Sequence, residues 1–351
     1  MDYILEYSND PLTFMSTTSL PTFGIAFVSI IFAIYLLVDL SLRAKRRNAL
    51  LNKHVLVTGG SCGIGRSVAL AAASRGAHVT IIARNEARLA RIHQELVDSY
   101  SECHGKQIFQ QISLDVTANY DVIEKVIRCA EEYAGPVHML VNCAGTSICS
   151  KFEDTPLDQF ERMIKLNLLG SVSPAKAVIR GMKARGSGHI VFTASQAALL
   201  GIYGYSAYSA SKFALRGVAE SLHMEVKPYG VCVTVALPPD TDTPGFAEEE
   251  KAKLEETRLI SQSSGLFTSD KVAEKILDDA IMGKFFSTVG LEGSILTTTC
   301  AGMSPVGSFF ELMWQILLMG PLRLVSACYL YSFGRIVEKC MRKRDIRKRS
   351  E

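Results

Sequence analysis

The sequence lacks the patterns that metal sites and nucleic-acid surfaces need. It holds nine cysteines and seven histidines, yet no Cys-x-x-Cys pair and no Cys/His spacing suits a metal ion. The net charge is only +3 over 351 residues, which argues against a nucleic-acid partner. An odd number of scattered cysteines is typical of free thiols in a reducing compartment. We therefore expect no metal site and no nucleic-acid partner.

The first 19 residues also lack Lys and Arg, although they contain three acids. The 23 residues of the apolar run 20–42 can cross a hydrocarbon core of about 30 Å. Basic residues begin at Arg43, and positive charge marks the cytosolic end of a membrane helix. The alternative, a cleaved signal peptide, would need a basic start. We predict a lumenal tail at 1–19, a transmembrane anchor at 20–42 and a basic linker at 43–52.

From Lys53 onward, short β-branched or apolar runs alternate with longer helical patterns. This alternation predicts an α/β domain at 53–290 with a Rossmann-type, doubly wound parallel sheet of about seven strands and helices on both faces. The strands are expected at His54–Thr58, His78–Ala83, Ile108–Val116, Met139–Asn142, His189–Ala194 and Val231–Leu237. The helices are expected at Ser67–Arg75, Glu86–Tyr100, Leu157–Arg185 and Ala207–Lys227.

A glycine turn follows the first expected strand and opens the first expected helix. Its pattern, Thr58-Gly59-x-x-x-Gly63-x-Gly65, lets the backbone approach a pyrophosphate and presents helix N-terminal amides to it. Glycine turns also simply join strands to helices, but here the context is the one that dinucleotide binding requires. The residues expected to contact the cofactor are Gly59, Ser61, Cys62, Gly63, Ile64 and Gly65.

The end of the second strand lacks the acid that would bind the ribose hydroxyls of NAD. The sequence there is Ala83-Arg84-Asn85, and Arg88 follows one helical turn after Arg84. Arginine offers bidentate donors to phosphate, so two guanidinium groups suit the 2′-phosphate of NADPH. Two solvated arginines at a helix start are the alternative. The missing acid favours NADPH.

Ser195, Tyr208 and Lys212 form a set that can protonate a carbonyl. Tyr208 and Lys212 are four apart, so they share one helix face. An ammonium beside a phenol should lower the phenol pKa, which is about 10 when unperturbed, toward a range useful for acid catalysis. Ser195, at a strand end, would donate a hydrogen bond to the reacting oxygen. A packed tyrosine and a surface lysine are the alternative for this spacing alone.

Together with three further motifs, these residues resemble the short-chain dehydrogenase/reductase family from Lys53 to about Gly290. The resemblance implies that Asp115-Val116 lies by the adenine, and that the turn after Asn142, Asn-Cys-Ala-Gly here, lines the cofactor cleft. Asn167 would hold a water that passes protons to Lys212, although Val116 has packing as its alternative. Thr243 would contact the nicotinamide amide, beyond a Pro238-Pro239 pair that stiffens the loop. The family also implies a possible homo-oligomer through its long helices.

The loop from Pro238, Pro-Pro-Asp-Thr-Asp-Thr-Pro-Gly-Phe-Ala-Glu-Glu, resembles the branch of this family that reduces a long-chain sphingoid ketone. That resemblance implies NADPH-dependent reduction of 3-ketosphinganine to sphinganine at the cytosolic face of the endoplasmic reticulum membrane. A reductase of a steroid or of a β-ketoacyl thioester is one alternative. A non-catalytic NADPH-binding membrane scaffold is another, and the complete catalytic set argues against it.

Residues 244–266 are expected to form a mobile lid over the cleft. Glu248–Arg258 is dense in charge, which is typical of a solvated helix face. The opposite face would be an apolar underside. Its expected residues are Phe246, Leu254, Leu259 and Ile260.

Apolar sequence returns near the C-terminus, broken by Gly320-Pro321. Each half, Phe309–Met319 and Leu322–Phe333, is shorter than the roughly 20 residues of a membrane span. We expect a re-entrant or interfacial helical hairpin at 291–334. The alternatives are two packed crossings, or two helices packed on the enzyme core or a dimer partner. The tail at 335–351 has eight Lys or Arg against three acids and should be cytosolic, where it could bind anionic lipid.

Overall fold

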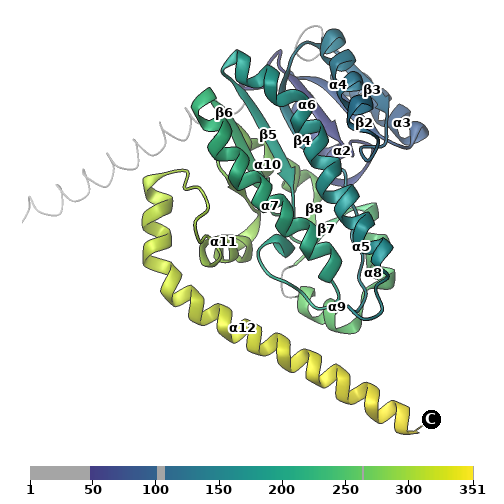
Figure 1. The fold of residues 1–351 in the computed structure, drawn as a ribbon, viewed down its shortest axis with the longest axis vertical. Helices are drawn as coiled ribbons and strands as arrows, with labels where there is room; N and C mark the ends of the chain where they lie inside the picture. Colours follow the sequence, from purple (N-terminus) through teal and green to yellow (C-terminus); the bar gives the residue numbers. More distant parts are fainter. Residues whose placement is uncertain (1–47, 101–106, 263–264, 351) are drawn as a thin grey trace, which may run out of the picture. The chain divides into compact units, whose positions relative to one another are not determined.

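The computed structural model describes residues 48–100, 107–262 and 265–350. The predicted lumenal tail at 1–19 and transmembrane anchor at 20–42 lie outside these residues, as does the first half of the linker at 43–52. Figure 1 labels the helices and strands of the unit that begins at Ala49.

The centre of the fold is a sheet of seven strands in the order β3-β2-β1-β4-β5-β6-β9. Each neighbouring pair in it is parallel, which confirms the predicted Rossmann-type sheet. The strand order reverses between β1 and β4, and ligands bind outside the carboxyl ends of the strands at such a point. The strands are β1 (His54–Thr58), β2 (His78–Ala83), β3 (Phe109–Ser113), β4 (Val137–Asn142), β5 (Gly188–Thr193), β6 (Val231–Ala236) and β9 (Phe286–Ser287).

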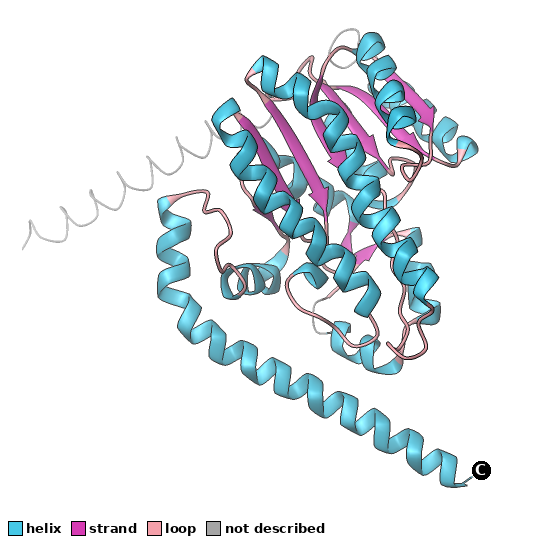
Figure 2. Cartoon of the chain, viewed as in Figure 1, coloured by secondary structure: helices cyan, strands magenta, loops and turns pink. Residues whose placement is uncertain are grey.

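Helices cover both faces of this sheet (Figure 2). One face packs against α2 (Gly63–Ala73), α3 (Glu86–Tyr100) and α10 (Ser269–Ile281), and the other against α4 (Tyr120–Ala134), α6 (Gly170–Arg185) and α7 (Ser206–Val226). The predicted helices correspond to α2, α3, α6 and α7. The sequence patterns did not single out α4, α10 or the short strand β9, because none of them carries a motif.

The central strands are buried on both faces, which explains their unbroken apolar runs. In β1, Val55 and Val57 belong to the apolar cluster with α2, α3 and α10, whereas Leu56 between them belongs to the cluster with α4, α6 and α7. Consecutive side chains of a strand point to opposite faces, so a strand covered on both sides needs apolar residues throughout.

A π-helical stretch interrupts the long helix predicted at Leu157–Arg185. The chain forms α5 (Leu157–Met163), the π-helix η1 (Ile164–Leu169) and then α6. Short π-helical segments within α-helices are frequent at functional sites. Asn167 lies in η1 and is fully buried, so this irregular turn positions one of the predicted catalytic residues.

The predicted lid contains two short helices, α8 (Pro244–Ala252) and α9 (Glu255–Ser261). Phe246 and Ile260 line the main cavity, as expected of an apolar underside. Leu254 is half-buried near Gly204. Leu259 is 40% exposed, so its expected place on the underside is wrong. Neighbouring residues of a helix point about 100° apart. Ile260 points toward the cavity, so Leu259 before it points toward solvent.

The C-terminal region differs from the predicted hairpin at 291–334. The helix α11 (Gly290–Thr299) packs on the core through Leu296. The next helix, α12 (Phe309–Ser350), runs through Pro321 without ending. The hairpin is therefore wrong. Proline removes one helical hydrogen bond and kinks a helix, and Figure 1 shows α12 bending in its N-terminal part rather than turning back.

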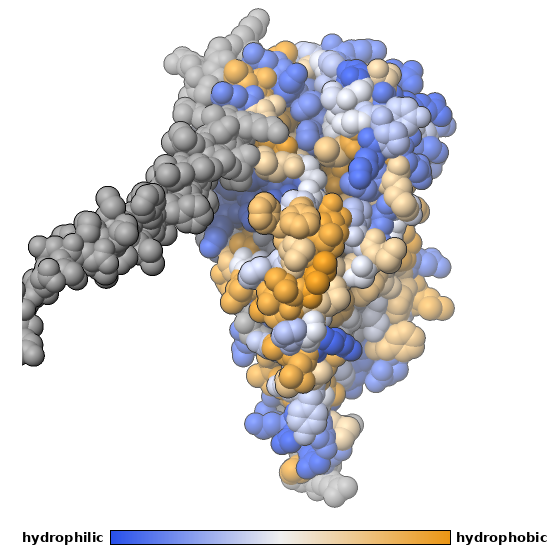
Figure 3. Space-filling view, turned by 90° about the vertical axis from the view of Figure 1, so that its left-hand side faces the viewer, coloured by the Kyte–Doolittle hydropathy of each residue, from blue (hydrophilic) through white to orange (hydrophobic). Residues whose placement is uncertain are grey.

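The first half of α12 exposes an apolar surface, and the second half is basic. Figure 3 shows apolar side chains gathered on this face and hydrophilic ones toward the end of α12. By length and composition alone, Phe309–Ile346 is a candidate membrane span among the described residues. The exposed apolar side chains include Phe309, Phe310, Trp314, Ile316, Leu317 and Leu324.

Both halves of α12 nevertheless contact the catalytic unit. Its first half packs against α11 and lines the main cavity. Near its other end, Lys343 lies 2.9 Å from Glu255 of α9, and Arg344 pairs with the buried carboxylate of Glu256. The helix therefore lies along the enzyme, from α11 to the lid.

Candidate active site

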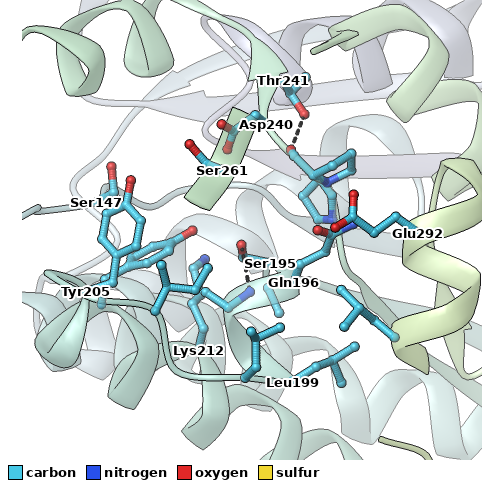
Figure 4. Close-up of a pocket in the computed structure, with 18 of the residues that line it drawn as sticks. Ser147, Ser195, Gln196, Leu199, Tyr205, Lys212, Asp240, Thr241, Ser261 and Glu292 are labelled. Carbon is cyan, nitrogen blue, oxygen red and sulfur yellow. Dashed lines mark hydrogen bonds between the residues drawn. The ribbon is translucent and has the colours of Figure 1, made fainter. Parts of the chain in front are cut away.

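A cavity of about 670 Å³ lies at the carboxyl ends of the central strands (Figure 4). Its walls come from the segments after β4, β5 and β6, from α2 and α7, from the lid and from both C-terminal helices. This is the position at which doubly wound sheets bind ligands. The cavity brings together five of the predicted site residues, Ile64, Ser195, Tyr208, Lys212 and Thr243.

Two positions of the glycine turn, Gly59 and Gly65, leave no space for a side chain. Gly59 has a φ of +69°, and a Cβ there would lie 2.7 Å from the backbone nitrogen of Ala144. A Cβ on Gly65 would lie 2.3 Å from the carbonyl oxygen of Gly59. Cys62 precedes α2 and gives it no side-chain cap within the described residues, so the first amides of this 11-residue helix are available to a phosphate. The turn thus fits a dinucleotide.

Thr243 lies against the glycine turn, since a Cβ on Gly63 would be 3.0 Å from its methyl carbon. Ser61, also in the turn, is buried. At the end of β4, the buried Asn142 side chain donates from Nδ2 to the carbonyl oxygen of Val191, 3.3 Å away. This bond ties β4 to β5 beside the predicted cofactor cleft.

Asp115 lies beyond β3, where its Oδ1 accepts hydrogen bonds from the backbone and hydroxyl of Thr117 at 2.9 and 2.8 Å. Burial raises the pKa of this carboxyl, but the bonds from Thr117 and the charge of Arg84 outweigh it, so the pKa is lowered. Val116 is 5% exposed and packs against Gly170. Its side chain is therefore packed in the core, and its place by the adenine stays a prediction.

The two arginines of the predicted 2′-phosphate site lie at the end of β2 and in the first turn of α3. The Arg84 side chain is 65% exposed and lies 3.9 Å from Asp115. Arg88 is exposed, and its backbone N–H donates to Oδ1 of Asn85 at 2.8 Å. Both guanidinium groups are thus accessible at the sheet edge where a dinucleotide places its adenosine ribose.

The structure brings Ser195, Tyr208 and Lys212 together. Ser195 follows β5, and its Oγ accepts a hydrogen bond from the Ala197 backbone at 3.2 Å. The same hydroxyl hydrogen-bonds Tyr208. Lys212 lies 5.7 Å from the centre of the Tyr208 ring and donates to the carbonyl oxygen of Thr193 at 2.8 Å. The face of α7 that carries Tyr208 and Lys212 points into the cavity, as predicted.

The expected lowering of the Tyr208 pKa is wrong for this structure. Burial raises the pKa of the phenol above its ordinary 10.0, and the carboxylates of Glu249 and Asp240 add to the rise against the bond from Ser195. Burial also lowers the pKa of Lys212 from 10.5 to about 8. The Lys212 ammonium is directed to a backbone carbonyl rather than to the phenol oxygen. Tyr208 is therefore a neutral phenol near pH 7, which is the form that can donate a proton.

Asn167 supports the loop after β4. Its Oδ1 accepts from the Thr146 backbone at 2.9 Å, and its Nδ2 donates to the Thr146 carbonyl and to Ser211 Oγ, each at 2.9 Å. A Cβ on Gly145 would lie 3.1 Å from Oδ1 of Asn167 and 3.6 Å from the Lys212 nitrogen. Asn167 thus adjoins Lys212 across Gly145, and its role in holding a water stays a prediction.

Motif reasoning missed a polar cluster in the cavity, which is formed by Ser147, Tyr205 and Glu249. The Glu249 carboxylate on α8 accepts hydrogen bonds from the hydroxyls of Tyr205 and Ser147. Tyr205 is 5% exposed, and its ring centre lies 5.5 Å from that of Tyr208. Glu249 and Tyr205 are 44 positions apart. They meet only in the folded structure, so no local sequence pattern predicts this cluster.

This arrangement can bind a dinucleotide at the glycine turn and donate a proton to an oxygen held by Ser195 and Tyr208. A family model described as short chain dehydrogenase matches residues 53–254. The chain belongs to the short-chain dehydrogenase/reductase family. As a member of that family it is an oxidoreductase that uses a nicotinamide cofactor.

Curated relatives match most of this short-chain dehydrogenase/reductase chain. The 3-ketodihydrosphingosine reductase of Bos taurus is 50% identical over 293 residues, 84% of this chain and 88% of the bovine one. The 3-dehydrosphinganine reductase of Danio rerio is 50% identical over 292 residues, 83% of this chain and 87% of its own. A 3-dehydrosphinganine reductase of Arabidopsis thaliana is 38% identical over 323 residues, 90% of this chain and 95% of its own.

Solved structures share the fold. A short-chain dehydrogenase from Streptomyces avermitilis has a TM-score of 0.59 and 30% identity, and the match covers 70% of this chain and 90% of that one. Levodione reductase has a TM-score of 0.62, with 68% of this chain and 96% of its own covered. Its 21% identity supports the shared fold alone.

Proposed function

We propose that this enzyme reduces the ketone of 3-ketosphinganine to the alcohol of sphinganine, with NADPH as its cofactor, in sphingolipid synthesis. One observation carries the proposal: the cavity that holds Ser195 and Tyr208 continues between α11 and α12, beside an exposed apolar surface. A ketone with a single long alkyl chain fits such a cavity. The curated relatives at 50% identity are named for this reaction.

The wall formed by the two C-terminal helices suits an alkyl chain. It is largely apolar, and its residues lie on the facing sides of α11 and α12. Lipid chains favour such surfaces because burying apolar area removes it from water. The residues on this wall include Leu291, Ile295, Leu296, Tyr329, Leu330 and Phe333.

Each catalytic residue has its own role in binding the carbonyl oxygen or in transferring the proton to it. When bound, the nicotinamide cofactor supplies the hydride. The Ser195 hydroxyl and the Tyr208 phenol hold the carbonyl oxygen, and Tyr208 donates its proton to it, since burial keeps the phenol protonated near pH 7. Lys212, buried on the same helix face, stabilises the tyrosinate that remains. Asn167 keeps the loop beside Lys212 in place.

The choice of NADPH follows from the residues around the adenosine end of the cleft. Arg84 and Arg88 are exposed where a 2′-phosphate would lie, and no acid occupies the end of β2. The glycine turn, Thr243 and the loop after Asn142 would hold the pyrophosphate and the nicotinamide.

We further propose that the enzyme works at the cytosolic face of the endoplasmic reticulum membrane. The apolar half of α12 would lie in the membrane interface, and the basic half would face anionic headgroups. Contacts of both halves with the enzyme favour this placement over a crossing. The anchor proposed at 20–42 would hold the domain at 53–290 to the same surface. Protease treatment of sealed microsomes should remove a C-terminal tag and protect an N-terminal one. A protected C-terminal tag would contradict this topology.

A substrate panel tests the function. Purified full-length protein with NADPH should reduce 3-ketosphinganine at least 100-fold more efficiently than a 3-ketosteroid or a β-ketoacyl thioester, measured as kcat/KM from NADPH oxidation. A difference of that size corresponds to about 2.7 kcal/mol of selective transition-state binding. Equal efficiency with the steroid would instead assign the enzyme to another hydrophobic ketone.

A further inference from the structure

Resting on the proposed function, we infer that Glu249 binds the ammonium group of the substrate and so makes the enzyme selective for amino ketones. In 3-ketosphinganine the carbon that bears the ammonium is bonded directly to the ketone carbon. Whatever holds the ketone at Tyr208 therefore also fixes the ammonium within a few ångströms of it. A group that recognises this ammonium must lie in the wall beside Tyr208.

Glu249 occupies that wall. Its carboxylate lines the cavity, its side chain is 16% exposed, and it accepts hydrogen bonds from the hydroxyls of Tyr205 and Ser147. The ring centres of Tyr205 and Tyr208 are 5.5 Å apart, so the carboxylate is one tyrosine removed from the catalytic phenol. A carboxylate has about four lone-pair sites, so two hydroxyl donors leave it able to accept from an ammonium.

The two substituents of the ketone must leave it in different directions. The alkyl chain packs against the apolar wall formed by α11 and α12. Figure 4 shows Glu292 of α11 on one side of Ser195 and Lys212, and Ser147 and Tyr205 on the other. The head group, opposite the chain, therefore points toward Ser147 and Tyr205, the two residues that hold the Glu249 carboxylate.

The charge around Glu249 is incompletely balanced. Lys253 is buried among three carboxylates, 3.2 Å from Asp240, 3.9 Å from Glu249 and in contact with Glu250 at 2.5 Å. Arg258 adds a second cation beside Glu250, at 3.4 Å. The three carboxylates therefore exceed the two cations by one negative charge. One more positive charge, such as the substrate ammonium, would neutralise this region.

The two other carboxylates of the cavity are poorer candidates. Asp240 already pairs with the ammonium of Lys253, 3.2 Å away. Glu292 shares its wall with the guanidinium of Arg323 from α12, and their formal charges cancel. That wall also carries the apolar residues expected to hold the chain. Glu292 is therefore the rival that the experiment must separate from Glu249.

The test compares two ketones in the full-length enzyme with NADPH. One is 3-ketosphinganine, and the other is 1-hydroxyoctadecan-3-one, which has the same chain, hydroxyl and ketone but hydrogen in place of the ammonium. The ratio of their kcat/KM values isolates the contribution of the ammonium. In the wild type this ratio should be about 10 to 100, the range for a charged hydrogen bond. Glu249→Gln should bring it close to 1 while kcat/KM for the deamino ketone changes less than about threefold.

Matched variants separate recognition from folding. Glu248→Gln alters an exposed neighbour on α8 and should leave the ratio at the wild-type value. Glu249→Asp keeps the charge and should retain part of the preference, so the inference stays testable if Glu249→Gln fails to fold. Equal losses with both ketones in Glu249→Gln would overturn the inference, and so would a ratio that collapses in Glu292→Gln instead. A wild-type enzyme that reduces neither ketone would contradict the proposed function itself.

Discussion

The cofactor half of the molecule and its substrate half are built in different ways. The cofactor half consists of the turns that follow β1, β4 and β5, and each turn is a short motif beside a largely buried strand. The substrate half consists of α8, α9, α11 and α12, and contacts between residues far apart in the sequence, such as those of α9 with α12, hold it together. Changes in the first half should therefore act on chemistry and cofactor binding. Changes in the second half should act on the choice of substrate.

The largest effect should come from Tyr208→Phe, which removes the proton donor and leaves the ring. We expect turnover of 3-ketosphinganine to fall by about 10³-fold or more, since a positioned general acid contributes about 10²–10⁴. The affinity for NADPH, measured by fluorescence titration, should change less than threefold. Tyr229→Phe, at a residue that is 49% exposed, is the matched control. Activity retained in Tyr208→Phe would remove the assignment of the acid.

Gly59→Ala tests the packing of the cofactor half. The added methyl would lie 2.7 Å from the Ala144 nitrogen, at a φ of +69° that alanine disfavours. We expect NADPH binding to weaken at least 30-fold and the free energy of unfolding to fall by about 1–3 kcal/mol. Gly217→Ala adds a methyl where no atom lies within 4 Å and should preserve both quantities. Normal NADPH affinity in Gly59→Ala would show that the turn tolerates a side chain.

The double change Arg84→Ala and Arg88→Ala tests the preference for NADPH. Both side chains are exposed, so we expect only about a 10-fold loss of NADPH affinity. NADH affinity should change less than twofold because it has no 2′-phosphate. Calorimetric titration of each cofactor measures the difference, and parallel losses would contradict a role in phosphate recognition.

The lid variants Phe246→Asn and Ile260→Asn test the substrate half. Each places an amide where the cavity is apolar, so KM for 3-ketosphinganine should rise about 5- to 10-fold. A short-chain amino ketone should show less than a twofold change. Leu259→Asn, on the exposed face of α9, is the control and should leave KM unchanged. Equal effects on long and short substrates would remove the lid from chain recognition.

The smallest effect concerns the pH dependence of stability. Burial lowers the pKa of Lys212 to about 8 from 10.5. Between these values the unfolded chain binds more protons at this lysine, so the stability of the wild type should rise with pH across that window. Relative to Lys212→Met, the gain should be about 1–3 kcal/mol, measured by denaturant unfolding in detergent without cofactor. A flat difference between the two proteins would mean that Lys212 keeps an ordinary pKa.

The cofactor half was predictable because its signals are local. The turn from Gly59 to Gly65 and the spacing of Tyr208 and Lys212 depend on one strand end or one helix face, and the structure places them as expected. The spacing of residues in the sequence, however, does not show how deeply a side chain is buried. The raised pKa of Tyr208 follows from the packing around it, including Glu249 from the lid, and the sequence rule about a nearby ammonium gave the opposite direction.

The substrate half was less predictable because long-range contacts decide it. Gly320-Pro321 is a strong breaking signal, yet α12 continues through it, and the helix is held at both halves by α11 and α9. The inward face of α9 includes Ile260 and not Leu259, which depends on how the lid packs on the core. The contact of Glu249 with Tyr205 has no local pattern at all. Homo-oligomer formation and the anchor at 20–42 stay predictions.

The most direct measurement follows both nucleotide and lipid in one reaction. Purified protein, NADPH and 3-ketosphinganine are mixed, NADPH is followed by absorbance, and sphinganine is quantified by mass spectrometry. We predict the loss of one NADPH for each sphinganine formed, and a rate of product formation at least about 10³-fold lower with Tyr208→Phe. A protein that binds NADPH but forms no sphinganine would contradict the reductase assignment and favour a non-catalytic scaffold.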